Sequence, residues 1–172
     1  MVDRLVLVNG LPGAGKTTLA TALAPALAAP LIAKDTIKEA VADALGTVPR
    51  HALGAAAAEM MWSLAAAVPG PVILESWWFT PRDLPFVEAG LDRCGRPHTV
   101  EVWCDVPARV ARDRYAARRR HPVHDDPRQL TDSWLRWAAG ATPLGVGHTV
   151  AVDTTRPVDV SALVARIREG PG

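Results

Sequence analysis

Gly10-Leu11-Pro12-Gly13-Ala14-Gly15-Lys16-Thr17 is the most informative segment of the chain, because it matches G-x-x-x-x-G-K-[ST] at every fixed position. A continuously apolar run over 5–8 precedes it, and a helical pattern begins at residue 18. Glycines let a backbone wrap closely around a phosphate, and a helix N-terminus adds partial positive charge there. The glycine spacing excludes the dinucleotide pattern G-x-G-x-x-G. The segment therefore predicts a phosphate-binding loop, with an ordinary glycine-rich turn as the alternative.

The side chains of this loop match the needs of a nucleoside triphosphate bound with magnesium. Lys16 is expected to neutralise the β- and γ-oxygens, and the Thr17 hydroxyl is expected to ligate Mg²⁺. The chain has no Asn-Lys-x-Asp segment, so a GTPase is disfavoured. The residues expected to contact the nucleotide here are Gly10, Gly13, Ala14, Gly15, Lys16, Thr17 and Thr18.

Apolar, strand-like runs alternate with longer helical patterns along the whole chain. The runs at 5–9, 31–33, 72–75, 99–104 and 148–152 predict strands. Helical patterns occupy 15–28, 36–45, 52–68, 81–93, 107–120, 127–139 and 157–169. Alternation of this kind is typical of an α/β fold in which a parallel sheet carries helices on both faces.

Length and composition favour one globular domain over 1–172. The chain has 172 residues, 49% hydrophobic and 22% charged, which excludes a disordered protein. Its 19 Lys and Arg residues nearly balance 18 Asp and Glu residues, so a dedicated nucleic-acid binder is disfavoured. No segment predicts a membrane span or a targeting signal. Cys94 and Cys104 lack metal-type or redox-type spacing, which indicates reduced thiols in a cytoplasmic protein.

Asp35 follows the short apolar run 31–33, just past the end of a predicted strand. Ligands of parallel sheets bind at the carboxyl edge, so this carboxylate is expected to face the transferred phosphate. There it would accept the proton of an attacking hydroxyl and help to order Mg²⁺. The alternative is that Asp35 only caps a helix that begins at Thr36.

An acid and an aromatic cluster follow the third predicted strand. Glu75 ends that strand and is expected to bind Mg²⁺ through water or to hydrogen-bond the acceptor. Trp77, Trp78 and Phe79 come next and are expected to wall a pocket for a ring-bearing or apolar acceptor. Arg82 is expected to pair with an anionic or hydroxylated part of that acceptor. The alternative is that one or two of the aromatic side chains only close the core.

Arginines crowd the segment 109–120, which makes it unlike the neutral remainder of the chain. Arg114 and Arg118 are four residues apart in a predicted helix, so they are expected to share one face and to reach one anionic ligand. Guanidinium groups that close over a transferred phosphate stabilise its charge and exclude water. The segment near 114–128 is therefore interpreted as an arginine-rich lid. A solvated basic face and a nucleic-acid patch are the alternatives, and the lack of other basic clusters disfavours the second.

The order of these features resembles the small AAA_33-type P-loop kinases. These include chloramphenicol-phosphotransferase-like and zeta-toxin-like proteins, with shikimate and gluconate kinases as more distant relatives. The resemblance spans nearly the whole chain, and only the phosphate-binding loop is highly specific. It is carried in order by 10–17, Asp35, Glu75, Arg114-x-x-x-Arg118 and the tail 152–159.

This resemblance implies a nucleoside-monophosphate-kinase-like fold with a five-stranded sheet in the order 2-3-1-4-5. It implies transfer of the ATP γ-phosphate to an alcohol, with Asp35 as the base. Arg114 and Arg118 match the lid arginines that hold ATP phosphates. The resemblance also implies that the loop after the fifth strand, around Thr154 to Pro157 and including Thr155 and Arg156, packs on adenine.

Together these observations predict an ATP- and Mg²⁺-dependent kinase that phosphorylates a hydroxyl of a small molecule, such as an antibiotic, a sugar or a nucleoside-like compound. A polynucleotide 5′-hydroxyl kinase and a non-catalytic nucleotide-binding module are the alternatives, and a homodimer is left open.

The expected catalytic residues are Asp35, Lys16 and Arg118; the expected metal ligands are Thr17 and Asp35. The expected acceptor contacts are Asp35, Glu75, Trp77, Trp78 and Arg82; Arg114, Arg118, Thr155 and Arg156 complete the nucleotide site.

Overall fold

The computed structural model describes residues 2–46, 49–124 and 126–169. Its centre is one sheet of five parallel strands in the order β2-β3-β1-β4-β5. The strands are β1 (Val2–Asn9), β2 (Leu31–Ala33), β3 (Gly70–Glu75), β4 (His98–Asp105) and β5 (His148–Asp153). The predicted α/β class, the parallel sheet and the strand order are confirmed.

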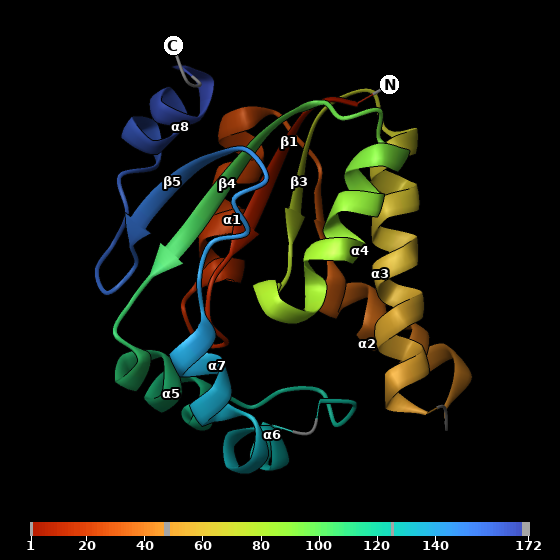
Figure 1. The fold of residues 1–172 in the computed structure, drawn as a ribbon, viewed down its shortest axis with the longest axis vertical. Helices are drawn as coiled ribbons and strands as arrows, with labels where there is room; N and C mark the ends of the chain where they lie inside the picture. The colour runs from red at the N-terminus through yellow and green to blue at the C-terminus, as the bar shows by residue number, and fades with distance from the viewer. Residues whose placement is uncertain (1, 47–48, 125, 170–172) are drawn as a thin grey trace.

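Helices cover both faces of this sheet (Figure 1). They are α1 (Lys16–Leu27), α2 (Lys34–Leu45), α3 (Arg50–Ala67), α4 (Thr80–Arg93), α5 (Ala108–Ala117), α6 (Asp126–Asp132), α7 (Trp134–Gly140) and α8 (Val160–Glu169). Successive residues of a strand point to opposite faces, so β1 contributes to two cores at once. Val6 and Val8 pack with α1 and α8, whereas Leu5 and Leu7 pack with α3 and α4. The continuously apolar run at 5–8 reflects this burial on both faces.

The strand register brings the carboxyl ends of β1, β2 and β3 together at one edge of the sheet. Glu75 pairs with Val8 of β1 and with Ala33 of β2. The loop after β1, the helix after β2 and the segment after β3 therefore begin side by side. Figure 1 shows the strand arrowheads pointing toward this edge, beyond which α5, α6 and α7 lie.

α3 is an alanine-rich helix of 18 residues that covers one face of the sheet beside α4. Met61 and Trp62 of α3 are buried against the sheet in the core that it shares with α4. Gly90 of α4 permits this packing, because a Cβ there would lie 2.2 Å from the Trp62 ring. Across the ranges that the structure describes, no helix is both long enough and apolar enough to cross a membrane.

Two of the predicted helices differ here from those observed, one by a break and one at its start. The predicted helix 127–139 is two helices, α6 and α7, with Ser133 between them as the N-cap residue of α7. α8 begins at Val160 rather than at residue 157. The Asp159 carboxylate accepts a hydrogen bond from the Ala162 amide at 3.0 Å, so it serves as the N-cap.

Candidate active site

The phosphate-binding loop between β1 and α1 is shaped by glycines with positive φ angles. Gly10, Gly13 and Gly15 have φ of 142°, 86° and 87°, a region that other residues rarely occupy. A Cβ at Gly10 would lie 2.7 Å from the Cys104 carbonyl oxygen, and a Cβ at Gly13 would lie 2.1 Å from that of Ala111. The loop therefore wraps tightly against the end of β4 and the middle of α5, and only glycine fits at these positions.

Lys16 lies inside this loop with its ammonium on the loop's own carbonyl groups. Its Nζ donates hydrogen bonds to the oxygens of Gly10 at 2.9 Å and of Leu11 at 3.0 Å. Burial lowers the pKa of Lys16, and the nearby Glu75 carboxylate opposes that shift. An anion bound in the loop would stabilise the charged ammonium, because it would replace neutral carbonyls as the partner.

Thr17 and Glu75 place hard oxygen atoms beside the loop. The Thr17 hydroxyl lies 3.4 Å from a carboxylate oxygen of the buried Glu75 and donates to it. Burial raises the pKa of Glu75, although Lys16 acts in the opposite direction. Among the described residues no cluster of three or more His, Cys, Asp or Glu side chains can hold a metal ion by itself. A Mg²⁺ ion held by these oxygens would therefore need further oxygens from a bound nucleotide.

Asp35 lies in the first turn of α2 and does not cap that helix. Ala33 is the N-cap residue, and no side chain accepts a capping hydrogen bond there. The cap-only alternative is therefore wrong. Burial disfavours the charged carboxylate of Asp35, but Arg120, His124 and Lys16 outweigh it and hold its pKa below the ordinary value. Asp35 is thus an ionised carboxylate within electrostatic reach of Lys16.

The segment that follows α5 docks on α2 through pairs of charged and polar side chains. Three acids of α2 spaced four residues apart form a stripe on one helix face, and each contacts a basic residue of this segment. The pairs are Arg120 with Asp35, His124 with Glu39 at 2.8 Å and His121 with Asp43 at 2.9 Å. Val123 packs against Ala42 and Leu53 in a small apolar cluster between them. The segment 118–124 therefore lies against α2, beside the proposed base.

Arg114 and Arg118 do not share one helix face, which corrects the prediction of a helix that continues to residue 120. α5 ends at Ala117, and Arg118 has an extended backbone (φ −83°, ψ 143°). The Arg114 guanidinium donates to the carbonyl oxygens of Thr154 at 3.0 Å and Thr155 at 3.2 Å. The Arg118 guanidinium lies 4.8 Å from the centre of the Tyr115 ring and acts electrostatically on Lys16 and Glu75. The two arginines therefore contact different parts of the site.

The loop after β5 supports the phosphate-binding loop from its outer side. The Thr154 hydroxyl donates to the carbonyl oxygen of Ala14 at 2.6 Å. The Thr155 amide donates to the Asp153 carboxylate at 2.9 Å, and Arg156 pairs with the same carboxylate at 3.1 Å. Thr155 and Arg156 are exposed. Thr154 belongs to the loop that the resemblance places on adenine, but its hydrogen bond to the phosphate-binding loop was not part of that expectation.

Asn9 is a second residue that the sequence analysis missed. It is fully buried at the end of β1, and its side-chain oxygen accepts hydrogen bonds from the amides of Gly10 at 2.8 Å and Trp78 at 3.1 Å. The loop after β1 and the segment after β3 are therefore held by one side chain. Its position directly before the glycine-rich motif is the sequence feature that could have identified Asn9 as a site residue.

The three aromatic residues after β3 have different surroundings. Trp78 is buried in the core with Leu5 and Leu7 of β1, so it fills the core rather than lining a pocket. Trp77 is half-buried, with its ring centre 5.9 Å from that of Phe79 and 6.2 Å from that of Trp137. Within the described chain the indole nitrogens of Trp77 and Trp137 are buried without a hydrogen-bond partner.

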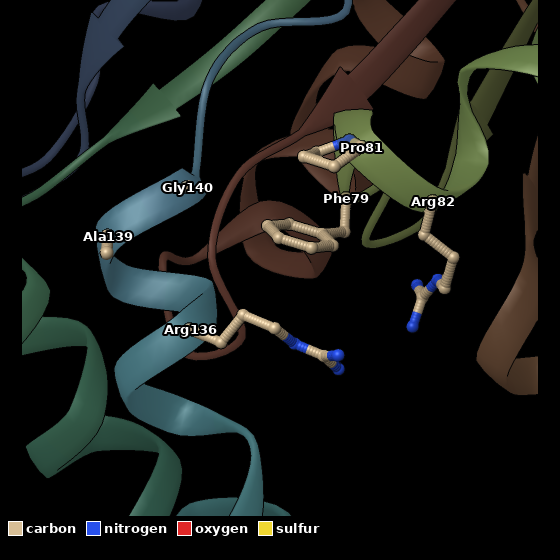
Figure 2. Close-up of a pocket in the computed structure, with 6 residues that line it drawn as sticks. All are labelled: Phe79, Pro81, Arg82, Arg136, Ala139 and Gly140. Atoms are coloured by element: carbon tan, nitrogen blue, oxygen red, sulfur yellow. The ribbon is translucent and has the colours of Figure 1, made fainter.

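A pocket of about 520 Å³ opens beside Phe79 (Figure 2). Arg82, which the sequence analysis assigned to the acceptor, is part of its wall, whereas Arg136 was missed because α7 is far along the chain. Figure 2 shows the ring of Phe79 above the side chain of Arg136, which comes from α7, and to the left of that of Arg82, which comes from α4. The residues that line the pocket are Phe79, Pro81, Arg82, Arg136, Ala139 and Gly140.

Comparison with known proteins agrees with this fold. The family model AAA_33, described as an AAA domain, matches residues 5–144. A candidate kinase from Chloroflexus aurantiacus J-10-fl is similar in structure, with a TM-score of 0.83, 30% identity and 98% of each chain covered. A gluconokinase from Sinorhizobium meliloti 1021 has a TM-score of 0.61 at 19% identity, covering 96% of this chain and 89% of its own. For a shikimate kinase from Bacteroides thetaiotaomicron the TM-score is 0.56 at 19% identity, covering 96% of both chains. No protein of curated function matches.

Proposed function

The chain belongs to the AAA_33 family of AAA domains, and on that premise we propose that it is an ATP- and Mg²⁺-dependent phosphotransferase acting on a hydroxyl of a small molecule. The observation that carries the proposal is the ionised Asp35 at the same sheet edge as the phosphate-binding loop, within electrostatic reach of Lys16. A loop for the triphosphate and a base for the acceptor are the two parts that phosphoryl transfer to an alcohol requires. The similarity to a candidate kinase at 30% identity over 98% of the chain supports the same reaction.

The loop residues would hold the triphosphate. The glycines leave room for phosphate oxygens near the backbone, and Lys16 would exchange its carbonyl partners for them. Thr17, Asp35 and Glu75 supply the hydroxyl and carboxylate oxygens that suit Mg²⁺. When bound, that ion would supply positive charge against the β- and γ-oxygens.

Asp35 would prepare the acceptor for attack. The acceptor oxygen forms a bond to the γ-phosphorus while the bond from that phosphorus to the β,γ-bridging oxygen breaks and ADP leaves. The hydroxyl proton passes to the Asp35 carboxylate as the new bond forms. Arg118 and Lys16 would stabilise the charge on the transferred group, because both already act electrostatically on Glu75.

The substitution Asp35→Asn tests the proposal. The variant should bind ATP as the native protein does, while formation of ADP with a panel of small alcohols falls at least about 100-fold, as expected for loss of a general base. Asp92→Asn is the matched control, because Asp92 is an exposed acid of α4 that pairs with Arg96. Unchanged turnover in Asp35→Asn contradicts the assignment of the base. ATP binding without turnover of any alcohol by the native protein favours a non-catalytic nucleotide-binding module.

A further inference from the structure

The pocket beside Phe79 has the chemistry of an anion site attached to an apolar surface. Building on the proposed function, we propose that the acceptor carries a carboxylate or phosphate group, which binds between Arg82 and Arg136 while its flat or apolar body lies on Phe79. The anionic oxygens are the shared chemistry of these two groups, and the experiment below distinguishes them. Arg136 was not expected from the sequence motifs, whereas Arg82 was expected to pair with an anionic or hydroxylated part of the acceptor.

The two guanidinium groups converge on one space. Figure 2 shows Arg82 extending from the first turn of α4 and Arg136 from α7, with both charged ends directed into the open region below the Phe79 ring. Like charges that face the same space repel each other, and an anion between them removes that cost. Guanidinium groups bind carboxylate and phosphate oxygens through paired N–H groups, so this arrangement matches a planar or tetrahedral oxyanion.

The charge around the pocket is positive. No acidic residue is part of its lining. Asp83 pairs with Arg82 at 2.7 Å, whereas Arg136 makes no ion pair within the described residues; its guanidinium lies 5.8 Å from the centre of the Phe79 ring. Lys34 adds a cation nearby, since it acts electrostatically with Arg82, Asp83 and Asp35. An anionic ligand would give Arg136 the acidic partner that Arg82 already has.

The arginine of α4 is held in place before any ligand arrives. Both carboxylate oxygens of Asp83 accept hydrogen bonds from Arg82, at 2.7 Å from Nε and 2.7 Å from an Nη. The same carboxylate accepts a hydrogen bond from the Phe79 backbone amide at 2.8 Å, so one group holds both the guanidinium and the backbone of Phe79. The remaining N–H groups of Arg82 are directed away from Asp83 and are available to a ligand. A side chain that is already ordered loses less entropy on binding.

α7, which carries Arg136, also approaches the Phe79 ring closely and gives the pocket an apolar side. A Cβ at Gly140 would lie 3.0 Å from the ring carbon Cε2, so this position needs a very small residue. Phe79 is itself mostly buried, so a ligand would contact the part of the ring that lines the pocket beside Ala139 and Gly140. Arg82 lies in the first turn of α4, which follows β3, and Asp35 lies in the first turn of α2, which follows the neighbouring strand β2. The pocket and the proposed base are therefore both placed by the carboxyl edge of the sheet.

Calorimetric titration with benzoate, phenyl phosphate and neutral benzamide tests the anion site without requiring turnover. The native protein should bind at least one of the two anions at least about tenfold more tightly than benzamide. Arg136→Gln should weaken anion binding by about tenfold or more and leave benzamide unchanged. Arg128→Gln is the matched control, because Arg128 is an exposed arginine of α6 paired with Asp132. The stronger of the two anions identifies the group.

Three results overturn the anion site. These are equal affinity for the anions and benzamide, equal effects of Arg136→Gln and Arg128→Gln, and no binding of any probe to the native protein up to about 10 mM.

Formation of ADP with 3-(hydroxymethyl)benzoate, 3-(hydroxymethyl)phenyl phosphate and 3-(hydroxymethyl)benzamide separates the anion site from the proposed function. Anion binding without transfer to any of the three overturns the proposed function and supports the anion site. Equal KM for the charged and neutral alcohols supports the proposed function and overturns the anionic acceptor.

Discussion

The side-chain amide of Asn9 donates a hydrogen bond to the carboxylate of Glu101 at 3.0 Å, one residue before the phosphate-binding loop begins. Both side chains are fully buried. The other donors to Glu101 are the backbone amides of Leu144, at 2.9 and 2.8 Å from its two oxygens, and of Gly145 at 3.2 Å. Glu101 thus joins β4 to the segment that follows α7 and fixes the orientation of Asn9, which in turn holds Gly10.

Replacing Glu101 with Gln should destabilise the protein by about 1–3 kcal/mol, because the new NH₂ group turns a donor toward the backbone amides of Leu144 and Gly145 that donate to the carboxylate. Denaturation by urea measures the free energy of unfolding. Glu88→Gln is the control, since Glu88 is exposed and pairs only with Arg96 among the contacts described, and it should change stability by less than about 0.5 kcal/mol. Equal stability of the two variants contradicts a supporting role for Glu101.

Much of the site could be predicted because its signals are local or follow from general topology. The loop at 10–17 carries its chemistry in consecutive residues. The positions of Asp35 and Glu75 follow from the rule that the carboxyl ends of parallel strands meet at one edge. The strand order came from the resemblance to the AAA_33-type P-loop kinases, and the structure confirms it.

The parts that were missed depend on contacts between distant segments. Glu101 lies in an apolar strand, and nothing near it in the sequence shows that Asn9 and Leu144 will surround its carboxylate. Arg136 reaches the pocket only because α7 folds back over Phe79. The helix before Arg118 ends early although the sequence there has no proline or glycine, so local pattern could not show that Arg114 and Arg118 separate.

Gly13 is the glycine of the loop that should tolerate substitution least. Gly13→Ala should destabilise the protein by at least about 2 kcal/mol and abolish ATP binding, because a Cβ would lie 2.1 Å from the Ala111 carbonyl oxygen at a φ of 86°. Thermal unfolding and ATP titration measure the two effects. Gly54→Ala is the control: it lies within α3 with nothing within 4 Å of its Cβ position, so it should stabilise the helix by up to about 1 kcal/mol. Similar effects of both substitutions contradict the close packing of the loop on α5.

Arg120 pairs with Asp35 from the segment that docks on α2, and this contact sets the protonation of the proposed base. Burial alone would raise the pKa of Asp35, and the Arg120 guanidinium is the largest of the opposing influences that hold it below its ordinary value. Asp35 therefore stays charged as the pH falls to its lowered pKa. Its contribution to stability is present above the ordinary carboxyl pKa and is lost as pH falls through the lowered value.

Arg120→Gln should move the acid limb of the pH dependence of kcat/KM to higher pH. Without the guanidinium, burial outweighs the remaining cations more easily, the pKa of Asp35 rises, and the base is protonated at a pH where the native protein is still active. Rates of ADP formation from about pH 4 to about pH 8 give the profile. Arg119→Gln removes the same charge from the neighbouring exposed position and should leave the limb in place. If the two variants shift the limb equally, general loss of positive charge explains the effect, and the pairing of Arg120 with Asp35 does not govern the base.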